Sequence, residues 1–195
     1  MTRIKLCGLS REEDILTANR LMPDYVGFVF WSRSKRYVSP ERAQALRKLL
    51  APGISAVGVF VDEDPENIAS LVHSGTIDII QLHGHENEDY ITSLRRLTSA
   101  PIIKAFKFGE VRDTSADYIM IDSGMGTGKT FDWSAVSITR PYFLAGGLSP
   151  ENVRLAVRTL HPFAVDVSSG IETDGRKDAE KMTAFAGAVR QEDTL

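Results

Sequence analysis

The sequence is poor in the features that mark secreted, membrane-bound and nucleic-acid-binding proteins. Its 195 residues include a single cysteine, Cys7, which cannot form an internal disulfide. The first ten residues lack the apolar core of a signal peptide, and the apolar runs are too short to span a membrane. The net charge is −3, with both signs interspersed, so no basic face is available for nucleic acid. These absences predict a cytoplasmic protein without nucleic-acid or membrane partners, and they leave its oligomeric state open.

Two kinds of segment alternate along the chain. Short runs rich in Val, Ile, Phe and Tyr have the length and composition of buried strands. They lie at residues 3–8, 25–30, 55–62, 77–84, 101–108, 118–122, 142–147 and 163–170. Charged amphipathic stretches with Ser or Asp near their starts, often followed by Pro or Glu, separate most of these runs and predict helices. They lie at residues 10–22, 39–51, 64–75, 86–98, 149–160 and 174–191.

This alternation predicts parallel strands, each covered by the helix that follows it. Eight such units fit a closed (β/α)₈ barrel, and we expect residues 1–195 to form one such domain. A barrel of this kind rarely has fewer than about 200 residues, so one or two helices must be short or degraded. Residues 109–117 are too short and polar for a proper helix, and residues 133–138 allow only a short one. A doubly wound open sheet remains the alternative, although its usual five or six strands leave some runs unplaced.

The glycine-rich stretch SGMGTGKT, residues 123–130, resembles a nucleotide-binding P-loop but does not match one. The P-loop spacing requires glycine where this chain has Ser123, and the nearest glycine makes the loop one residue too short. A P-loop also opens into a long helix, whereas Pro141 follows closely here. We therefore expect a loop that covers a ligand other than a nucleotide.

In a barrel the active site lies at the carboxyl ends of the strands, where the seventh and eighth runs end in small residues. Backbone N–H groups at such positions, next to a helix start, are suited to bind phosphate. The residues concerned are Gly146, Gly147, Ser168, Ser169 and Gly170. They are also compatible with ordinary tight turns and caps. We expect a phosphorylated small molecule as the substrate.

Cys7 and Asp122 end the first and sixth runs, on opposite sides of the expected barrel. Such a pair can divide the roles of general base and general acid. Each residue also has a simpler explanation, since a lone cysteine is usually a small buried apolar group and an aspartate often forms a turn. Their shared position at strand ends favours the catalytic interpretation.

Other candidates come from the second and fourth runs. Arg36, in the loop that follows the second run, can hold a carboxylate with two hydrogen bonds, or it can belong to a solvated basic loop. Gln81 and His83 close the fourth run, and we expect both to contact the substrate. His83 and His85 also raise the question of a metal, which would need a third ligand such as Asp62, Asp122 or Asp166. The spacing alone is weak, and we predict no metal site.

Several stretches taken together resemble the phosphoribosylanthranilate isomerase family of tryptophan biosynthesis. The resemblance extends in order over residues 3–189 and is carried by KLCGL (5–9), SKRYVSPERA (34–43), GVFVD (58–62), DIIQLHG (78–84), IDSGMGTGKTFDW (121–133), LAGGLSPENV (144–153) and VDVSSGIET (165–173). The family is a (β/α)₈ barrel that performs an Amadori rearrangement without a cofactor. Its substrate is N-(5-phosphoribosyl)anthranilate, an aminoaldose, which becomes an aminoketose.

The resemblance implies a role for each matching residue. Cys7 matches the general base that removes the proton from C2 of the sugar, and Asp122 matches the general acid that opens the ring. Arg36 matches the partner of the anthranilate carboxylate, although Ser34 and Lys35 stand where a proline commonly precedes this arginine. An enclosed site would raise the pKa of Asp122, and Lys5 could favour a Cys7 thiolate.

Two other functions fit the same barrel. One is a related phosphate-binding enzyme such as a ribulose-phosphate epimerase, which would need a metal at the histidines. The other is a barrel that binds phosphate without catalysis, against which the intact pair of Cys7 and Asp122 argues.

Overall fold

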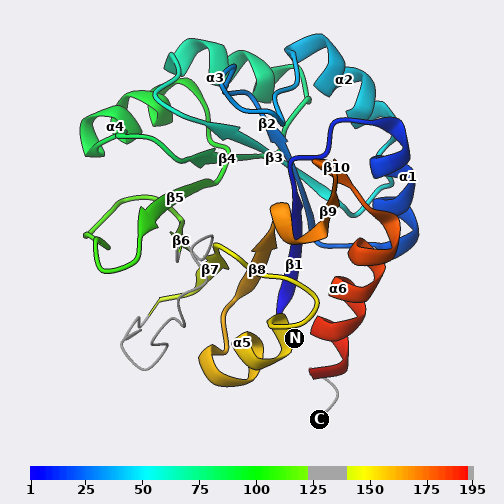
Figure 1. Ribbon diagram of the computed structural model, residues 1–195. Helices are drawn as coiled ribbons and strands as arrows, with labels where there is room; N and C mark the ends of the chain where they lie inside the picture. Colours follow the sequence, from blue (N-terminus) through cyan, green and yellow to red (C-terminus); the bar gives the residue numbers. More distant parts are fainter. Residues whose placement is uncertain (123–139, 193–195) are drawn as a thin grey trace.

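The computed structural model describes residues 1–122 and 140–192, and its centre is a closed barrel of parallel strands (Figure 1). Each strand pairs with the next one along the chain, and the last pairs with the first, which closes the ring. The strands are β1 (Arg3–Cys7), β2 (Tyr25–Val29), β3 (Ser55–Phe60), β4 (Ile79–Leu82), β5 (Ile102–Lys107), β6 (Tyr118–Asp122), β7 (Tyr142–Ala145) and β8 (Ala164–Val167). The predicted (β/α)₈ fold is confirmed, and an open doubly wound sheet is excluded.

The helices lie outside the ring of strands (Figure 1). They are α1 (Glu12–Leu21), α2 (Pro40–Leu49), α3 (Pro65–His73), α4 (Glu88–Leu97), α5 (Val153–Leu160) and α6 (Ala179–Glu192). Ser39 and Asp64 cap α2 and α3 as predicted, each followed by proline at the first helical position. α5 starts later than the sequence suggested, because a turn occupies the residues between Ser149 and Asn152.

The connection between β5 and β6 contains no helix, as its short polar sequence predicted. The glycine-rich stretch 123–130 and the short helix predicted at 133–138 lie outside the described residues. The last helix begins at Ala179 because the residues before it form a small antiparallel hairpin. This hairpin consists of β9 (Glu172–Thr173) and β10 (Arg176–Lys177) and follows a single turn of 3₁₀ helix, η3 (Ser169–Ile171).

Alternate side chains of each strand point to opposite sides of the barrel wall. On β1, Ile4 and Leu6 pack into the large apolar layer beneath the helices, whereas Cys7 packs with Val29 and Val59. On β3, Phe60 lies in the outer layer. Every second residue of a strand therefore points into the barrel, and the last such residue lies at the opening formed by the carboxyl ends of the strands.

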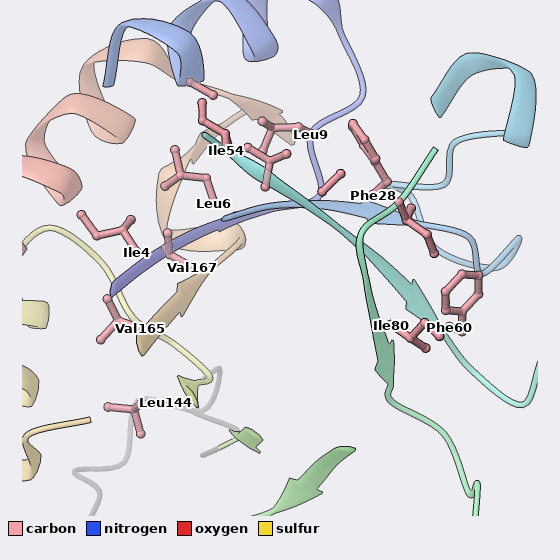
Figure 2. Close-up of a cluster of buried hydrophobic side chains, with 14 of the residues drawn as sticks. Ile4, Leu6, Leu9, Phe28, Ile54, Phe60, Ile80, Leu144, Val165 and Val167 are labelled. Atoms are coloured by element: carbon pink, nitrogen blue, oxygen red, sulfur yellow. The ribbon is translucent and has the colours of Figure 1, made fainter. Parts of the chain in front are cut away.

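Two apolar layers hold this architecture together. The outer layer fills the space between strands and helices, and Figure 2 shows part of it around Leu6, Phe28, Phe60 and Val167. A separate inner cluster fills the barrel towards the amino ends of the strands, with Phe143 in contact with other aromatic rings there. The inner cluster closes one end of the barrel, so the opening for a ligand lies at the other end. None of the helices in the described ranges has the length and apolarity needed to cross a membrane.

Candidate active site

The carboxyl ends of the strands surround a cavity of about 530 Å³. Most of the residues predicted from the sequence line it. These are Cys7, Arg36, Gln81, His83, Asp122, Gly146, Gly147, Ser168 and Ser169. A smaller cavity of about 300 Å³, between Tyr37 and Asn67, contains none of them. The expectation that site residues lie at the carboxyl ends of the strands therefore identified residues that the fold brings together around one cavity.

Gly170 does not line the cavity, and its contribution is to packing. A Cβ atom at this position would lie 1.9 Å from the carbonyl oxygen of Leu148. Only glycine lets the loop after β8 approach the loop after β7 so closely. The two loops with small residues that were predicted to bind phosphate therefore lie against each other, and Gly147 and Ser168 both face the cavity.

Cys7 is buried beside a charged pair. The Lys5 Nζ donates to Asp166 Oδ1 at 2.7 Å, and the Lys5 side chain is completely buried. Burial lowers the pKa of Lys5, but the attraction of Asp166 and Cys7 outweighs burial and the pKa is raised. For Cys7, burial raises the pKa of the thiol, and the nearby Lys5 and Lys177 offset only part of this effect. Lys5 thus favours the thiolate as expected, but burial prevails and the resting group is a thiol.

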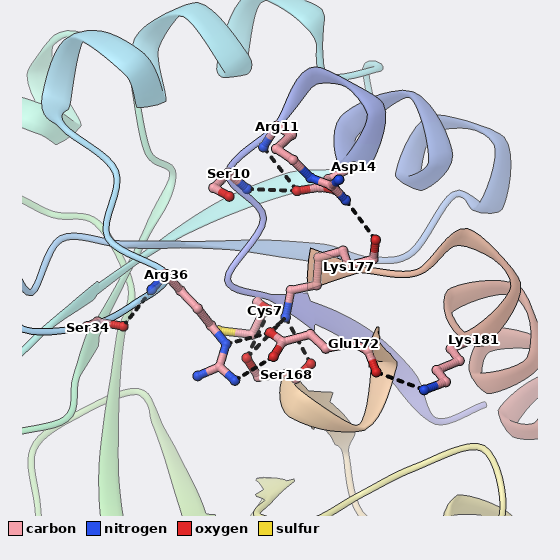
Figure 3. Close-up of polar contacts among 10 residues, drawn as sticks. All are labelled: Cys7, Ser10, Arg11, Asp14, Ser34, Arg36, Ser168, Glu172, Lys177 and Lys181. Atoms are coloured by element: carbon pink, nitrogen blue, oxygen red, sulfur yellow. Dashed lines mark hydrogen bonds and ion pairs between the residues drawn. The ribbon is translucent and has the colours of Figure 1, made fainter. Parts of the chain in front are cut away.

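The Arg36 guanidinium is held by a carboxylate that belongs to the chain itself (Figure 3). Its Nε and Nη2 donate to the two oxygens of Glu172 at 2.6 and 2.9 Å. Lys177 Nζ donates to the same carboxylate at 2.7 Å and to the backbone oxygen of Ser168 at 2.9 Å. No partner for Nη1 is found among residues 1–122 and 140–192. This end of the fork remains available for a second carboxylate.

Glycine at position 8 makes this placement of Arg36 feasible. Gly8 has a φ of +78°, and a Cβ atom there would lie 2.5 Å from Cδ of Arg36. The arginine stem therefore crosses directly over the backbone that follows Cys7. This close approach brings the guanidinium and the thiol to the same wall of the cavity.

His83 and Asp122 meet on another wall. The His83 Nε2 lies 3.4 Å from Asp122 Oδ2, and each side chain is about one third exposed. The His83 Nδ1 lies 3.0 Å from the amide nitrogen of Gln81, whose side chain is buried. The amide oxygen of Gln81 is buried and has no hydrogen-bond partner among the described residues, and an unmet buried acceptor typically costs about 1–3 kcal/mol.

His83 and His85 do not turn towards a common point. The His85 Nδ1 pairs with Asp62 Oδ2 at 2.9 Å on the surface, while His83 turns towards Asp122. In the part of the chain that the structure describes, no three His, Cys, Asp or Glu side chains are grouped closely enough to hold a metal ion. The two imidazoles therefore have separate local partners.

Lys177 and Glu172, which hold Arg36 and the loop after β8, were not predicted from the sequence. Lys177 is buried, although it follows a turn in a polar stretch, and Glu172 had been noted only as part of the VDVSSGIET motif. Both belong to the hairpin after β8, and Glu172 reaches Arg36 across 136 positions of sequence. Lys177 and Glu172 pair across the short hairpin, and their opposite charges five residues apart were the local signal that could have indicated this contact.

Known proteins resemble the chain over nearly its whole length. The family model described as N-(5'phosphoribosyl)anthranilate (PRA) isomerase matches residues 4–188. A relative from Lacticaseibacillus casei (strain BL23), named N-(5'-phosphoribosyl)anthranilate isomerase, is 43% identical over 98% of this chain and 96% of its own length.

Solved structures agree with this result. The phosphoribosyl anthranilate isomerase of Thermotoga maritima superposes with a TM-score of 0.87 at 37% identity and covers 98% of this chain and 100% of its own. A phosphoribosyl anthranilate isomerase in complex with reduced 1-(o-carboxyphenylamino)-1-deoxyribulose 5-phosphate superposes with a TM-score of 0.84 at 36% identity, with the same coverage. The chain therefore belongs to the N-(5'-phosphoribosyl)anthranilate isomerase family.

Proposed function

We propose that this chain converts N-(5-phosphoribosyl)anthranilate to 1-(2-carboxyphenylamino)-1-deoxyribulose 5-phosphate in tryptophan biosynthesis. The observation that carries the proposal is that Cys7 and Asp122, from β1 and β6, face one cavity that Arg36 also lines. Family membership supports the same reaction. One relative with this fold has been solved with a reduced form of the product.

Asp122 is the proposed general acid. Ring opening breaks the bond between C1 and the ring oxygen, and that oxygen takes the proton of the Asp122 carboxyl group. The nitrogen lone pair then forms the C1–N double bond of a protonated Schiff base. The position of Asp122 at the end of β6, with one third of its side chain exposed to the cavity, supports this role.

Cys7 is the proposed general base. Its thiolate, the minor form of a group that rests as a thiol, removes the proton from C2. The electron pair of that C–H bond forms a C1–C2 double bond and neutralises the Schiff base. The resulting enolamine becomes the aminoketose when C2–OH loses its proton and C1 gains one. Oxidation at C2 balances reduction at C1, so the substrate itself supplies all the electrons. The charged neighbours Lys5 and Lys177 offset part of the cost of burying this thiolate.

The two anionic ends of the substrate have separate binding groups. The Nη1 end of Arg36 is the proposed partner of the anthranilate carboxylate, and Glu172 fixes the plane of the fork. Gly146, Gly147, Ser168 and Ser169 form the proposed phosphate site. Gln81 and His83 complete the wall beside Asp122. We also place the enzyme in the cytoplasm, where a single unpaired thiol such as Cys7 stays reduced.

The proposed roles of the acid and the base are tested by Cys7→Ser and Asp122→Asn. We expect each change to lower kcat by about 10²–10⁴, the usual worth of a positioned acid or base, with a smaller change in KM. Asp62→Asn is the matched control, because Asp62 is a half-exposed aspartate that pairs with His85 at the surface. Near-normal kcat in both active-site variants would disprove the assignment.

A further inference from the structure

We propose that Gln81 is a positioning residue that fixes the proton of His83 on Nε2, and that this N–H serves the carboxyl group of Asp122. The inference rests on the proposed role of Asp122 as the general acid and extends it to a chain of three side chains. It changes the expectation for His83 and Gln81 from contacts with the substrate to control of the acid.

The chain of contacts runs from β4 to β6. Gln81 lies in β4 and His83 directly follows that strand, whereas Met120 and Asp122 are alternate residues of β6. The amide nitrogen of Gln81 lies 3.2 Å from the Met120 sulfur and 3.0 Å from His83 Nδ1. The other ring nitrogen of His83 lies 3.4 Å from Asp122 Oδ2. One buried amide thus touches both the histidine and the strand that carries the acid.

The acceptor character of sulfur determines which way the Gln81 amide faces. A thioether has no proton to give, so only the NH₂ group of the amide can bond to Met120. The same NH₂ group then has its second proton directed at His83 Nδ1. A donor facing Nδ1 requires a lone pair there, so the proton of the neutral ring sits on Nε2.

The position of this proton matters for Asp122 in both of its states. While Asp122 carries its proton, an Nε2–H offers no basic lone pair that could take the proton from the acid. After the proton has moved to the ring oxygen, the same N–H donates to the new carboxylate and stabilises it. The opposite tautomer would do the reverse, because its Nε2 lone pair would accept the acid's proton and repel the anion.

The buried Gln81 amide is also poorly suited to a purely structural role. Within residues 1–122 and 140–192, its oxygen is buried without a hydrogen-bond partner, while its nitrogen has two. A buried polar group with an unmet acceptor weakens the fold, so a packing role would be better served by an apolar side chain of similar size. Its orientation towards His83 accounts for its presence.

The first test reads the tautomer directly in the free enzyme. Histidine ¹⁵N spectra at about pH 8.5, well above the ordinary imidazole pKa of about 6.5, distinguish a protonated ring nitrogen from one with a lone pair. The chain has only four histidines, and the His83→Gln variant identifies the His83 signals. We expect Nε2 protonated in the parent and Nδ1 protonated in Gln81→Glu, whose carboxylate accepts from Nδ1–H. A proton on Nδ1 of the parent would overturn the proposal.

The second test separates positioning from packing and from substrate binding. We expect Gln81→Leu to retain or raise the midpoint of thermal unfolding, to lower kcat at least about 10-fold, and to change KM by less than about 3-fold. A raised KM with normal kcat would mean that Gln81 binds substrate, and normal values of both would mean that it does neither. Either result overturns the proposal. The matched control is His85→Gln, whose side chain lies at the surface, and we expect parental kcat and KM.

Comparison of Asp122→Asn with Gln81→Leu distinguishes loss of the acid from loss of the group that positions it. If Asp122→Asn lowers kcat but Gln81→Leu does not, Asp122 acts without the relay. If Asp122→Asn leaves kcat unchanged, the acid itself is misassigned, whatever the tautomer of His83. The ¹⁵N measurement needs no turnover, so it judges the relay in either case.

Discussion

Replacing Glu172 by glutamine removes the anion that Arg36 and Lys177 share at the wall of the active-site cavity. The glutamine keeps the shape of the side chain and one acceptor oxygen, but it has no charge. We expect the variant to lose stability, because two cations remain close together, and to bind the substrate more weakly, because the Arg36 fork is no longer held in one plane.

The size of the stability loss follows from the pKa of Glu172. Burial alone raises this pKa, but the hydrogen bonds and charges of Arg36 and Lys177 outweigh burial and lower it from 4.5 to about 2. At about 1.4 kcal/mol for each pH unit, the ionised carboxylate contributes about 3 kcal/mol to folding.

Lys177 gives the opposite sign for the same contact. Burial lowers the pKa of Lys177 even though Glu172 attracts its charge. The contacts among Arg36, Glu172 and Lys177 together therefore contribute less to the free energy of folding than the pKa of Glu172 alone suggests. The lower pKa is consistent with a lysine that is only 3% exposed. Removal of the carboxylate alone nevertheless leaves Lys177 buried without its counter-ion, so about 3 kcal/mol is the appropriate figure for this variant.

The difference in unfolding free energy between the parent and Glu172→Gln should depend on pH, because it comes from the charge of the Glu172 carboxylate. Because the pKa of Glu172 is lower in the folded state than in the unfolded state, its contribution is complete above about pH 4.5 and is lost as the pH falls towards 2. Urea unfolding should therefore show a gap between parent and variant of about 3 kcal/mol at about pH 7, which shrinks to about 1.5 kcal/mol at about pH 3.

The exposed Glu110 provides the control, since Glu110→Gln removes a carboxylate from the loop after β5 and should leave stability unchanged at both pH values. If the difference in unfolding free energy between parent and Glu172→Gln is the same at both pH values, the variant has lost packing and not a charge, and the ionised carboxylate does not stabilise the fold as described. A parental KM in Glu172→Gln would show that Glu172 does not hold Arg36 in position for the substrate.

Three further predictions concern other parts of the site. Burial raises the pKa of Cys7. The absorbance of its thiolate, measured with Cys7→Ser as the blank, should therefore appear only above the ordinary thiol pKa of about 8.5. A thiolate that appears at lower pH would mean that the lysines outweigh burial. Arg36→Lys keeps the charge but loses the fork, and we expect KM to rise at least about 10-fold; an unchanged KM would exclude Arg36 as the carboxylate partner. Gly170→Ala forces a methyl group against the Leu148 carbonyl. We expect the free energy of unfolding, measured with urea, to fall by about 1–3 kcal/mol, and inorganic phosphate to bind more weakly. Parental stability would mean that the loops after β7 and β8 separate without cost.

The barrel could be predicted because its pattern is local. Each strand is an apolar run a few residues long, and helix starts such as Ser39–Pro40 and Asp64–Pro65 are read from adjacent residues. Parallel strands in a ring must present their carboxyl ends at one opening, so the end of each run pointed to the cavity. This geometric rule brought Cys7 of β1 into the same group as Asp122 of β6.

The contacts between these residues could not be predicted in the same way. The pairing of Arg36 with Glu172, and of Lys177 with Ser168, depends on where a hairpin after β8 lies in space. Spacing along the chain has no information about such a contact. The packing role of Gly170 was missed for the same reason, since its neighbour Leu148 comes from a different loop.

The balance of opposing effects at Cys7 was also beyond the sequence. The presence of Lys5 two residues away correctly suggested a cation beside the thiol, but the sequence did not show how deeply the thiol is buried. Burial and charge have opposite effects on the pKa, and only the structure shows that burial prevails.

The isomerase reaction is measured by adding the enzyme to freshly generated phosphoribosylanthranilate and following the loss of its anthranilate fluorescence. We expect rapid loss with the parent enzyme, and a rate about 10²–10⁴-fold lower with either Cys7→Ser or Asp122→Asn. Fluorescence that stays constant with the parent enzyme would contradict the proposed reaction.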